Sequence, residues 1–301
     1  MLELGAGADI LRAIGWLYIG FAAALLWACL WFPRRWWQKI VWAVAVLLVF
    51  LLPMYWRQAE KSRIVDARKA RYEKGKALFD ERCKTAGEKV YKTVEDVEGV
   101  LLQEVWPNSG DSDWHDPHWS NAGLPRQYGA ESYIQSFIMF EHQSHPPQRG
   151  YLNTKDRGAH DWYKTLPGYA FVDVKESDGF VYRYRPVPPA PPELKSMSRE
   201  RLSGATARYA ISFRGITVNP ADRDQWVAGM TVLITDTQNN EVIAEKTWYS
   251  FERGFGSKSG WRSPWLFAIT CPATNGGKPE RSSAYETRFF VDQVLKPQKE
   301  N

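Results

Sequence analysis

The chain has 301 residues, of which 44% are hydrophobic and 24% charged, and its net charge is +5 at neutral pH. The first 56 residues contain four basic and two acidic residues, which leaves a net charge of +3 on the rest. So small a positive charge excludes the profile of a nucleic-acid-binding protein.

Two uncharged segments lie near the N-terminus, at residues 13–32 and 40–56. Each is close to the ~20 residues that a helix needs to cross a ~30 Å hydrocarbon layer. Aromatic residues suited to the membrane interface flank them: Trp31, Trp36, Trp37, Tyr55 and Trp56. The sequence therefore predicts a transmembrane hairpin over residues 1–56, with the lipid bilayer as a partner and Pro53 as a kink or early end of the second helix.

Residues 57–86 combine helix-forming residues and dense charge with a thin apolar stripe, which predicts a helical stalk that stops near Gly87. Eight Lys or Arg residues fall within its first twenty positions. These basic side chains are suited to anionic lipid head groups.

The charges around the hairpin disagree about its orientation. The short connection carries Arg34, Arg35 and Lys39 without an acid, which favours a cytoplasmic loop with both termini outside. The basic stalk favours the reverse. Cys29 lies in the first apolar segment, so Cys83 and Cys271 remain either to pair in an oxidising compartment or to stay as two unrelated buried thiols. We expect a bacterial inner-membrane protein whose C-terminal part, residues 87–301, faces the periplasm.

That C-terminal part has the pattern of a mainly β domain. Strand-like segments occur at residues 89–94, 99–102, 169–174, 179–185, 207–218, 230–235 and 242–251, and an aromatic extended segment at 261–270. Turn residues separate the later segments, and residues 284–295 have helical spacing. The predicted fold class is α+β: a transmembrane hairpin, a helical stalk, and a mainly antiparallel β domain with a C-terminal helix.

Residues 107–165 read mainly as loops and contain all five histidines. Four side chains in this region have imidazole or carboxylate groups that could bind a divalent metal, which would suit a metal-dependent hydrolase: Asp113, His115, His118 and His142. They lack the spacing that places two ligands on one helical face. We expect a loop surface that binds a protein partner through Trp114, His115, His118 and Trp119, with no metal.

No local catalytic signature occurs elsewhere. The segment Gly254 to Gly260 is glycine-rich but lacks the spacing of a phosphate-binding loop, and no GxSxG, SxxK or CxxC motif is present. We therefore expect no enzymatic activity and no cofactor. Eight tryptophans outside the predicted hairpin are expected to divide between core packing and interface anchors: Trp106, Trp114, Trp119, Trp162, Trp226, Trp248, Trp261 and Trp265.

Several short segments carry a resemblance. They are residues 226–229, 236–237, 241–245, 262–268, Gly254 and the pair Cys271 and Pro272. Over about residues 205–272, with a looser likeness at 79–99, the chain resembles a group of uncharacterised proteobacterial membrane-anchored proteins that looks like it includes immunity proteins of type VI secretion phospholipase effectors. The resemblance implies a periplasmic binding domain, a disulfide between Cys83 and Cys271, and no enzymatic activity.

The leading hypothesis is a membrane-tethered periplasmic protein that neutralises a secreted toxin by binding it. The alternatives are the metal-dependent hydrolase and a structural or assembly component of an envelope complex.

Overall fold

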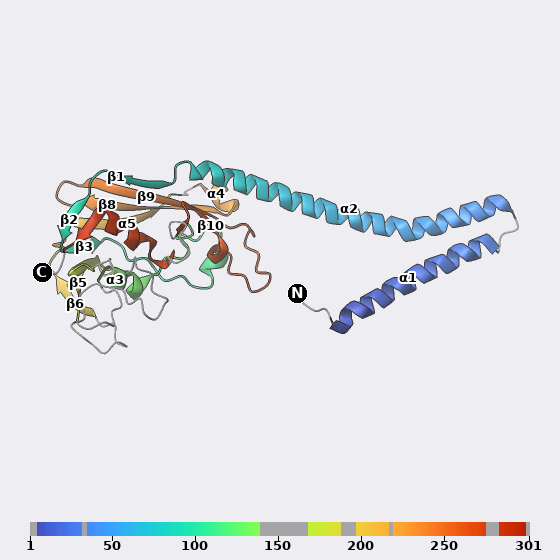
Figure 1. Ribbon diagram of the computed structural model, residues 1–301, viewed down its shortest axis with the longest axis horizontal. Coiled ribbons are helices and arrows are strands. Elements are labelled where there is room, and N and C mark those ends of the chain that lie inside the picture. The colour runs from blue at the N-terminus through green and yellow to red at the C-terminus, as the bar shows by residue number, and fades with distance from the viewer. Residues whose placement is uncertain are drawn as a thin grey trace. The chain divides into compact units, whose positions relative to one another are not determined.

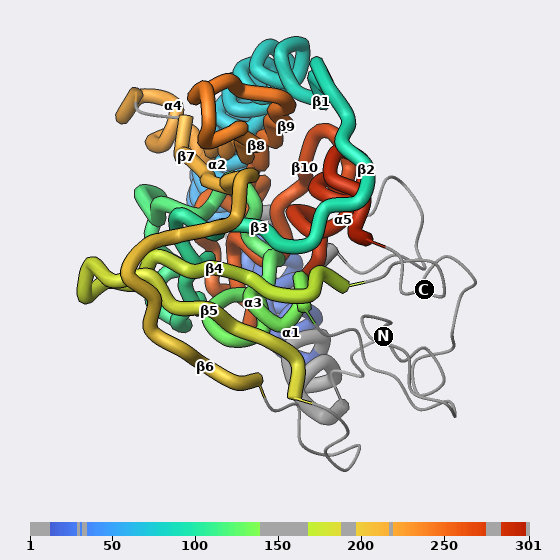
Figure 2. The backbone as a smooth tube through the Cα atoms, turned by 90° about the vertical axis from the view of Figure 1, so that its left-hand side faces the viewer, coloured from blue at the N-terminus to red at the C-terminus, as the bar shows by residue number. Residues whose placement is uncertain are grey.

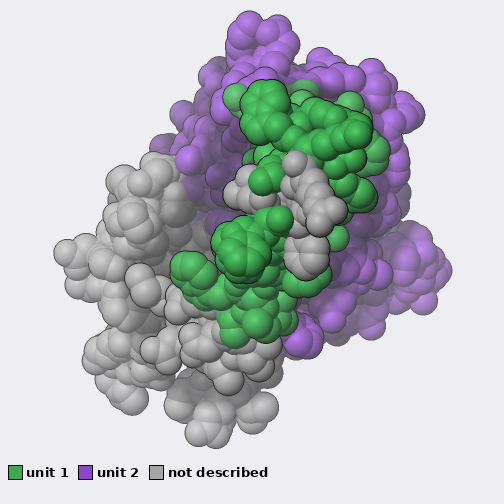
Figure 3. Space-filling view, turned by 90° about the vertical axis from the view of Figure 1, so that its right-hand side faces the viewer, with its two compact units in different colours: residues 1–71 green, residues 72–301 purple. Residues whose placement is uncertain are grey.

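A computed structural model describes residues 5–31, 35–138, 168–187, 197–216, 219–274 and 283–298. The chain divides into two compact units, Met1–Arg71 and Tyr72–Asn301, which Figure 3 colours separately. The sequence predicts a hairpin over residues 1–56, a stalk over 57–86 and a β domain over 87–301. The division at Arg71 falls inside the predicted stalk, so the last turns of the stalk belong to the C-terminal unit.

Two helices account for the described part of the N-terminal unit. Helix α1 spans Gly5–Trp31, and helix α2 spans Trp36–Cys83 with Pro53 in its interior. The Tyr18 ring lies 5.0 Å from the Phe50 ring, so the two helices touch. Among the residues described, α2 is the one helix long and apolar enough to cross a membrane, while α1 contributes the shorter apolar stretch Ala13–Ala28. The membrane hairpin itself stays a prediction.

Helix α2 continues past Pro53, so the proline does not end it. Proline removes one backbone donor, and an apolar helix tolerates this loss where neighbouring groups adjust. The same helix contains most of the predicted stalk and stops at Cys83, four residues before Gly87, whose φ of 122° opens the first strand. Gly87 is suited to this turn because it has no Cβ.

The C-terminal unit is built on a large sheet. Within the described residues, nine strands join in the order β1-β9-β8-β7-β3-β4-β5-β6, with β10 also paired to β9 (Figure 2). The strands are β1 Gly87–Val90, β3 Gly99–Leu102, β4 Phe171–Lys175, β5 Val181–Pro186, β6 Met197–Leu202, β7 Tyr209–Gly215, β8 Val227–Asp236, β9 Glu241–Phe251 and β10 Ile269–Cys271. A separate pair joins β2 Val94–Val97 to β11 Leu295–Pro297. The unit is α+β with a mostly antiparallel sheet, as predicted.

Strand β3 is the exception to the antiparallel pairing. It runs parallel to both of its neighbours, β4 and β7, and β11 runs parallel to β2. Parallel strands are joined by a long crossover, so they lie far apart in the sequence. No hairpin turn between them marks their pairing in the sequence. The sheet is therefore mixed at its centre.

Helices cover the sheet on both faces (Figures 1 and 2). The Tyr72 to Cys83 part of α2 packs on one face, where Phe79 joins Val227, Tyr249 and Phe251. Helices α3 Ala130–Ile138 and α5 Glu286–Val294 pack on the other face, against alternate residues of the same strands such as Met230 and Trp248. Because neighbouring residues of a strand point to opposite faces, β8 and β9 serve both layers.

A disulfide joins Cys83 at the end of α2 to Cys271 in β10, across 188 positions of sequence. Strand β10 is short, and the residues before it form a 3₁₀ turn at Trp265–Phe267. The extended segment predicted at 261–270 is thus wrong over most of its length, because Trp265 turns inward and is fully buried.

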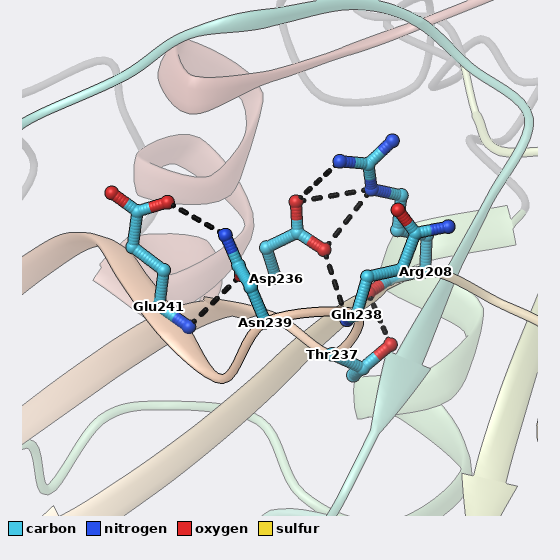
Figure 4. Close-up of polar contacts among 6 residues, drawn as sticks. All are labelled: Arg208, Asp236, Thr237, Gln238, Asn239 and Glu241. Atoms are coloured by element: carbon cyan, nitrogen blue, oxygen red, sulfur yellow. Dashed lines mark hydrogen bonds and ion pairs between the residues drawn. The ribbon is translucent and has the colours of Figure 1, made fainter.

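The β8–β9 turn is held by side chains (Figure 4). Arg208 Nη2 lies 2.7 Å from Asp236 Oδ2, and Asn239 Oδ1 accepts a hydrogen bond from the Glu241 backbone N–H at 3.1 Å. Asn240 has a positive φ of 57°, which asparagine tolerates well. The structure therefore confirms the turn expected between the strand-like segments at 230–235 and 242–251.

Candidate functional site

A cleft of about 760 Å³ opens on the C-terminal unit. The segment after β3, the loop before α3, strands β7 and β8, and the short helix α4 Pro220–Asp224 form its walls. Its lining residues are Glu104, Val105, Pro107, His118, Ser120, Asn121, Phe213, Gly215, Pro220, Arg223 and Met230. Such a volume is ordinary for a binding site.

The loop that carries His118 and Asn121 is fixed to the sheet. Trp265 Nε1 donates to the Asp116 backbone oxygen at 2.8 Å, and Ser250 Oγ donates to the Ala122 backbone oxygen. At Gly123 a Cβ atom would lie only 2.5 Å from the Gly229 backbone, so glycine is needed for this close approach. The cleft wall is therefore a rigid part of the fold.

Helix α4 is held at its N-terminus and at its middle residue. Asn219 caps its N-terminus, where Asn219 Oδ1 accepts the Ala221 N–H at 2.9 Å, and Pro220 takes the first turn. Asp222 pairs with Arg82 of α2 at 2.8 Å. These contacts direct the next side chain, Arg223, to the inside of the unit.

Arg223 is only 5% exposed. It donates a hydrogen bond to the Trp119 backbone oxygen, and its guanidinium carbon lies 5.5 Å from the Trp265 ring centroid. Burial lowers the pKa of Arg223 to about 10, against the attraction of Asp116, and the group remains charged at neutral pH.

Asn121 lines the same cleft and is 4% exposed. Its buried Nδ2 has no hydrogen-bond partner among the described residues. A buried amide donor without a partner costs free energy, roughly 1–3 kcal/mol, so such groups are uncommon.

The rest of the cleft is partly polar and partly apolar. Glu104 and His118 are exposed, and His118 Nε2 lies 3.8 Å from Asp224 Oδ1. Val105, Phe213 and Met230 supply apolar lining. The cleft thus combines a buried cation and an amide with apolar walls.

The residues predicted to bind a partner have different environments in the structure. His118 lines the cleft, whereas Trp119 is 7% exposed and belongs to a buried cluster with Trp226 and Trp265. Trp114 packs against this cluster, and His115 Nδ1 is buried without a described partner. Trp119 therefore contributes packing rather than exposed surface.

The described residues give little support to the hypothesis of a metal-dependent hydrolase. Asp113 Oδ2 accepts the Gly110 backbone N–H at 2.8 Å, and His115 and His118 are not gathered with it into a group able to hold an ion within the described ranges. His142 lies outside the described residues. Of the other tryptophans, Trp106, Trp226, Trp248 and Trp265 are buried, Trp261 is fully exposed, and Trp162 lies outside the description.

Sequence reasoning missed Arg223, Asn121 and Glu104. The pair Asn219 and Pro220 is a helix-start signal that predicts α4. No local sequence pattern predicts that Arg223 is buried, because its burial depends on Trp119 and Trp265, which lie in distant parts of the chain. In comparisons with known proteins, no family model, no curated protein and no solved structure matches this chain.

Proposed function

We propose that this protein is a membrane-anchored, non-enzymatic binding protein whose C-terminal unit lies in the bacterial periplasm and recognises a protein partner at the cleft. The observation that carries the proposal is the cleft itself, where Arg223 is buried and the buried Asn121 Nδ2 has no hydrogen-bond partner among the described residues. Buried polar groups of this kind are satisfied when a ligand supplies the missing contacts.

Two features support the anchor and the compartment. Helix α2 contains an apolar stretch long enough for a membrane, and that stretch is not buried in the structure. Cys83 and Cys271 are bonded, and disulfides persist in oxidising compartments such as the periplasm. Both features agree with a tethered domain outside the cytoplasm.

The nature of the partner rests on the resemblance over residues 205–272. It supports an immunity role, in which the protein binds a secreted antibacterial phospholipase and blocks it. A tether in the inner membrane would hold the binding domain where a membrane-attacking toxin acts.

Cross-linking from the cleft tests the binding role. A photo-reactive amino acid placed at Pro107, an exposed residue of the cleft lining, should attach to one defined protein in cells that carry the secretion system. The same residue at Ser177, exposed in the β4–β5 turn, is the matched control. Equal adducts from both positions, or none from Pro107, would contradict the proposal.

Competition between sibling cells tests the immunity role. Cells that lack the gene should lose viability when attacked by secreting siblings, and a copy of the gene should restore it. Survival of the deletion strain under active secretion would reject immunity while leaving the cross-linking result to decide on partner binding.

A further inference from the structure

Arg223 differs from Arg288, the other buried arginine among the described residues, and from the partly buried Arg183. Arg288 and Arg183 each meet a carboxylate, Asp292 and Asp173 respectively. No carboxylate in the described ranges forms an ion pair with Arg223, which donates to one backbone oxygen and lies over one ring, while Asp116 attracts it from beyond ion-pair distance. A buried cation without a paired anion is costly, so the cleft is built to receive one.

The Asn121 amide is positioned to assist. Arg223 donates to the Trp119 backbone oxygen, two residues before Asn121, so its guanidinium lies close to the segment of chain that carries Asn121. Asn121 Nδ2 is a buried donor without a described partner in the same cleft. A planar guanidinium and an amide N–H together match the two oxygens of a carboxylate.

The remaining lining restricts the ligand. Val105, Phe213 and Met230 suit an apolar side chain next to the acid. Glu104 on the lining adds a negative charge, which disfavours ligands with two or more charges, such as phosphate groups. One carboxylate on a partly apolar segment fits all three features.

We propose that the cleft holds its protein partner by a carboxylate, which Arg223 and Asn121 bind. The inference rests on the proposed function, because it assumes that the partner docks at this cleft. The carboxylate belongs either to an aspartate or glutamate side chain or to the C-terminus of the partner.

The test uses the full-length protein in detergent micelles with ¹⁵N-labelled arginine. Three probes distinguish the sources: N-acetyl-leucyl-aspartic acid α-amide with a side-chain carboxylate, N-acetyl-leucine with a terminal carboxylate, and neutral N-acetyl-leucyl-asparagine amide. Inorganic phosphate is the fourth probe. At least one acidic probe should shift the Arg223 Nε–H resonance saturably, and the neutral probe should not.

Variants provide the second measurement. R223Q should weaken the acidic probe at least about 10-fold, because it removes one partner of a buried charge pair. R223K keeps the positive charge but not the forked guanidinium group, so it should retain part of the affinity. It also identifies the Arg223 resonance if R223Q does not fold. R201Q is the matched control, because Arg201 is exposed on edge strand β6 and stacks on Phe180.

E104Q removes the competing negative charge at an exposed position. It should raise affinity for the acidic probe about twofold to threefold at low salt, and this gain should shrink as added salt screens the charges. No change in E104Q together with equal effects of R223Q and R201Q would overturn the inference, as would stronger binding of phosphate than of either carboxylate.

The two proposals fail separately. If Pro107 cross-links to a partner whose binding is unchanged in R223Q, the carboxylate inference is wrong and the binding role stands. If the probes bind as expected but no position in the cleft cross-links to a protein, the carboxylate site stands and the protein-partner role is wrong.

Discussion

Asp236 is a buried carboxylate, 1% exposed, at the end of β8. Its hydrogen bonds to Arg208, at 2.7 to 3.0 Å, and to the Gln238 backbone N–H, at 3.1 Å, lower its pKa below the usual 3.8, although burial opposes them. A folded-state pKa below the unfolded value means that folding favours the ionised form. This contribution to stability is present above the unfolded pKa and is lost as pH falls through the folded pKa.

We therefore expect D236N to alter the acid limb of stability. The wild-type free energy of unfolding should fall more steeply than that of D236N as the pH falls below about 4, because only the wild type must protonate this carboxylate. Urea unfolding at several pH values measures the difference. D224N is the control, since Asp224 is largely exposed, and an identical pH slope in wild type and D236N would refute the assignment.

Two tryptophans close in sequence have opposite environments. Trp265 is fully buried and lies 5.3 Å from the Trp226 ring, whereas Trp261 is fully exposed. W265A should cost about 3–5 kcal/mol of stability, because it leaves a large cavity. W261A should change stability by less than about 0.5 kcal/mol. Thermal unfolding of both variants tests the placement, and a similar loss in each would contradict it.

Strand β9 connects more elements than any other strand of the described sheet. It pairs with β8, β1 and β10, and its two faces contact α2 and α5 through Phe251 and Trp248. The disulfide adds a covalent link between β10 and the end of α2. The cleft depends on this arrangement, because Arg82 of α2 pairs with Asp222 of α4 beside Arg223.

Loss of the disulfide should therefore be felt throughout the C-terminal unit. Because the bond closes a loop across 188 positions, the double variant C83S/C271S should lose about 2–5 kcal/mol of stability. Denaturant unfolding under non-reducing conditions is the measurement. C29S is the control, and a double variant as stable as C29S would show that the bond contributes little.

At the scale of the whole molecule, the chain divides at Arg71 into two units. The buried core clusters lie in the C-terminal unit, from Phe79 to Leu295. Exposed apolar side chains are concentrated in the other unit, for example at Trp16, Leu17 and Val49. Large exposed apolar surfaces require lipid or a partner.

A fragment of residues 72–301 should accordingly be soluble and fold on its own, while the full chain should need detergent. Size-exclusion chromatography and near-UV circular dichroism of the fragment test this expectation. If the fragment aggregates or lacks fixed tertiary signals, the N-terminal unit is required for folding.

Much of the fold was predictable from local patterns. The apolar runs at residues 13–32 and 40–56, the alternation along β8 and β9, and the asparagine turn between them depend on neighbouring residues alone. Strand β6, with the sequence Met-Ser-Arg-Glu-Arg-Leu, lacked such a pattern because it is an edge strand whose exposed side chains are mostly polar.

Periodicity and turn chemistry are local properties, so the apolar N-terminal segments, the charged helix that follows them and the succession of strands could be predicted from the sequence. Three features became visible only in the folded chain: β3 runs parallel between β4 and β7, Trp119 lies in the core, and Arg223 is buried in a cleft. Each of these depends on residues distant in sequence that meet when the sheet closes, and burial sets the cost of a charge only once those neighbours are in place.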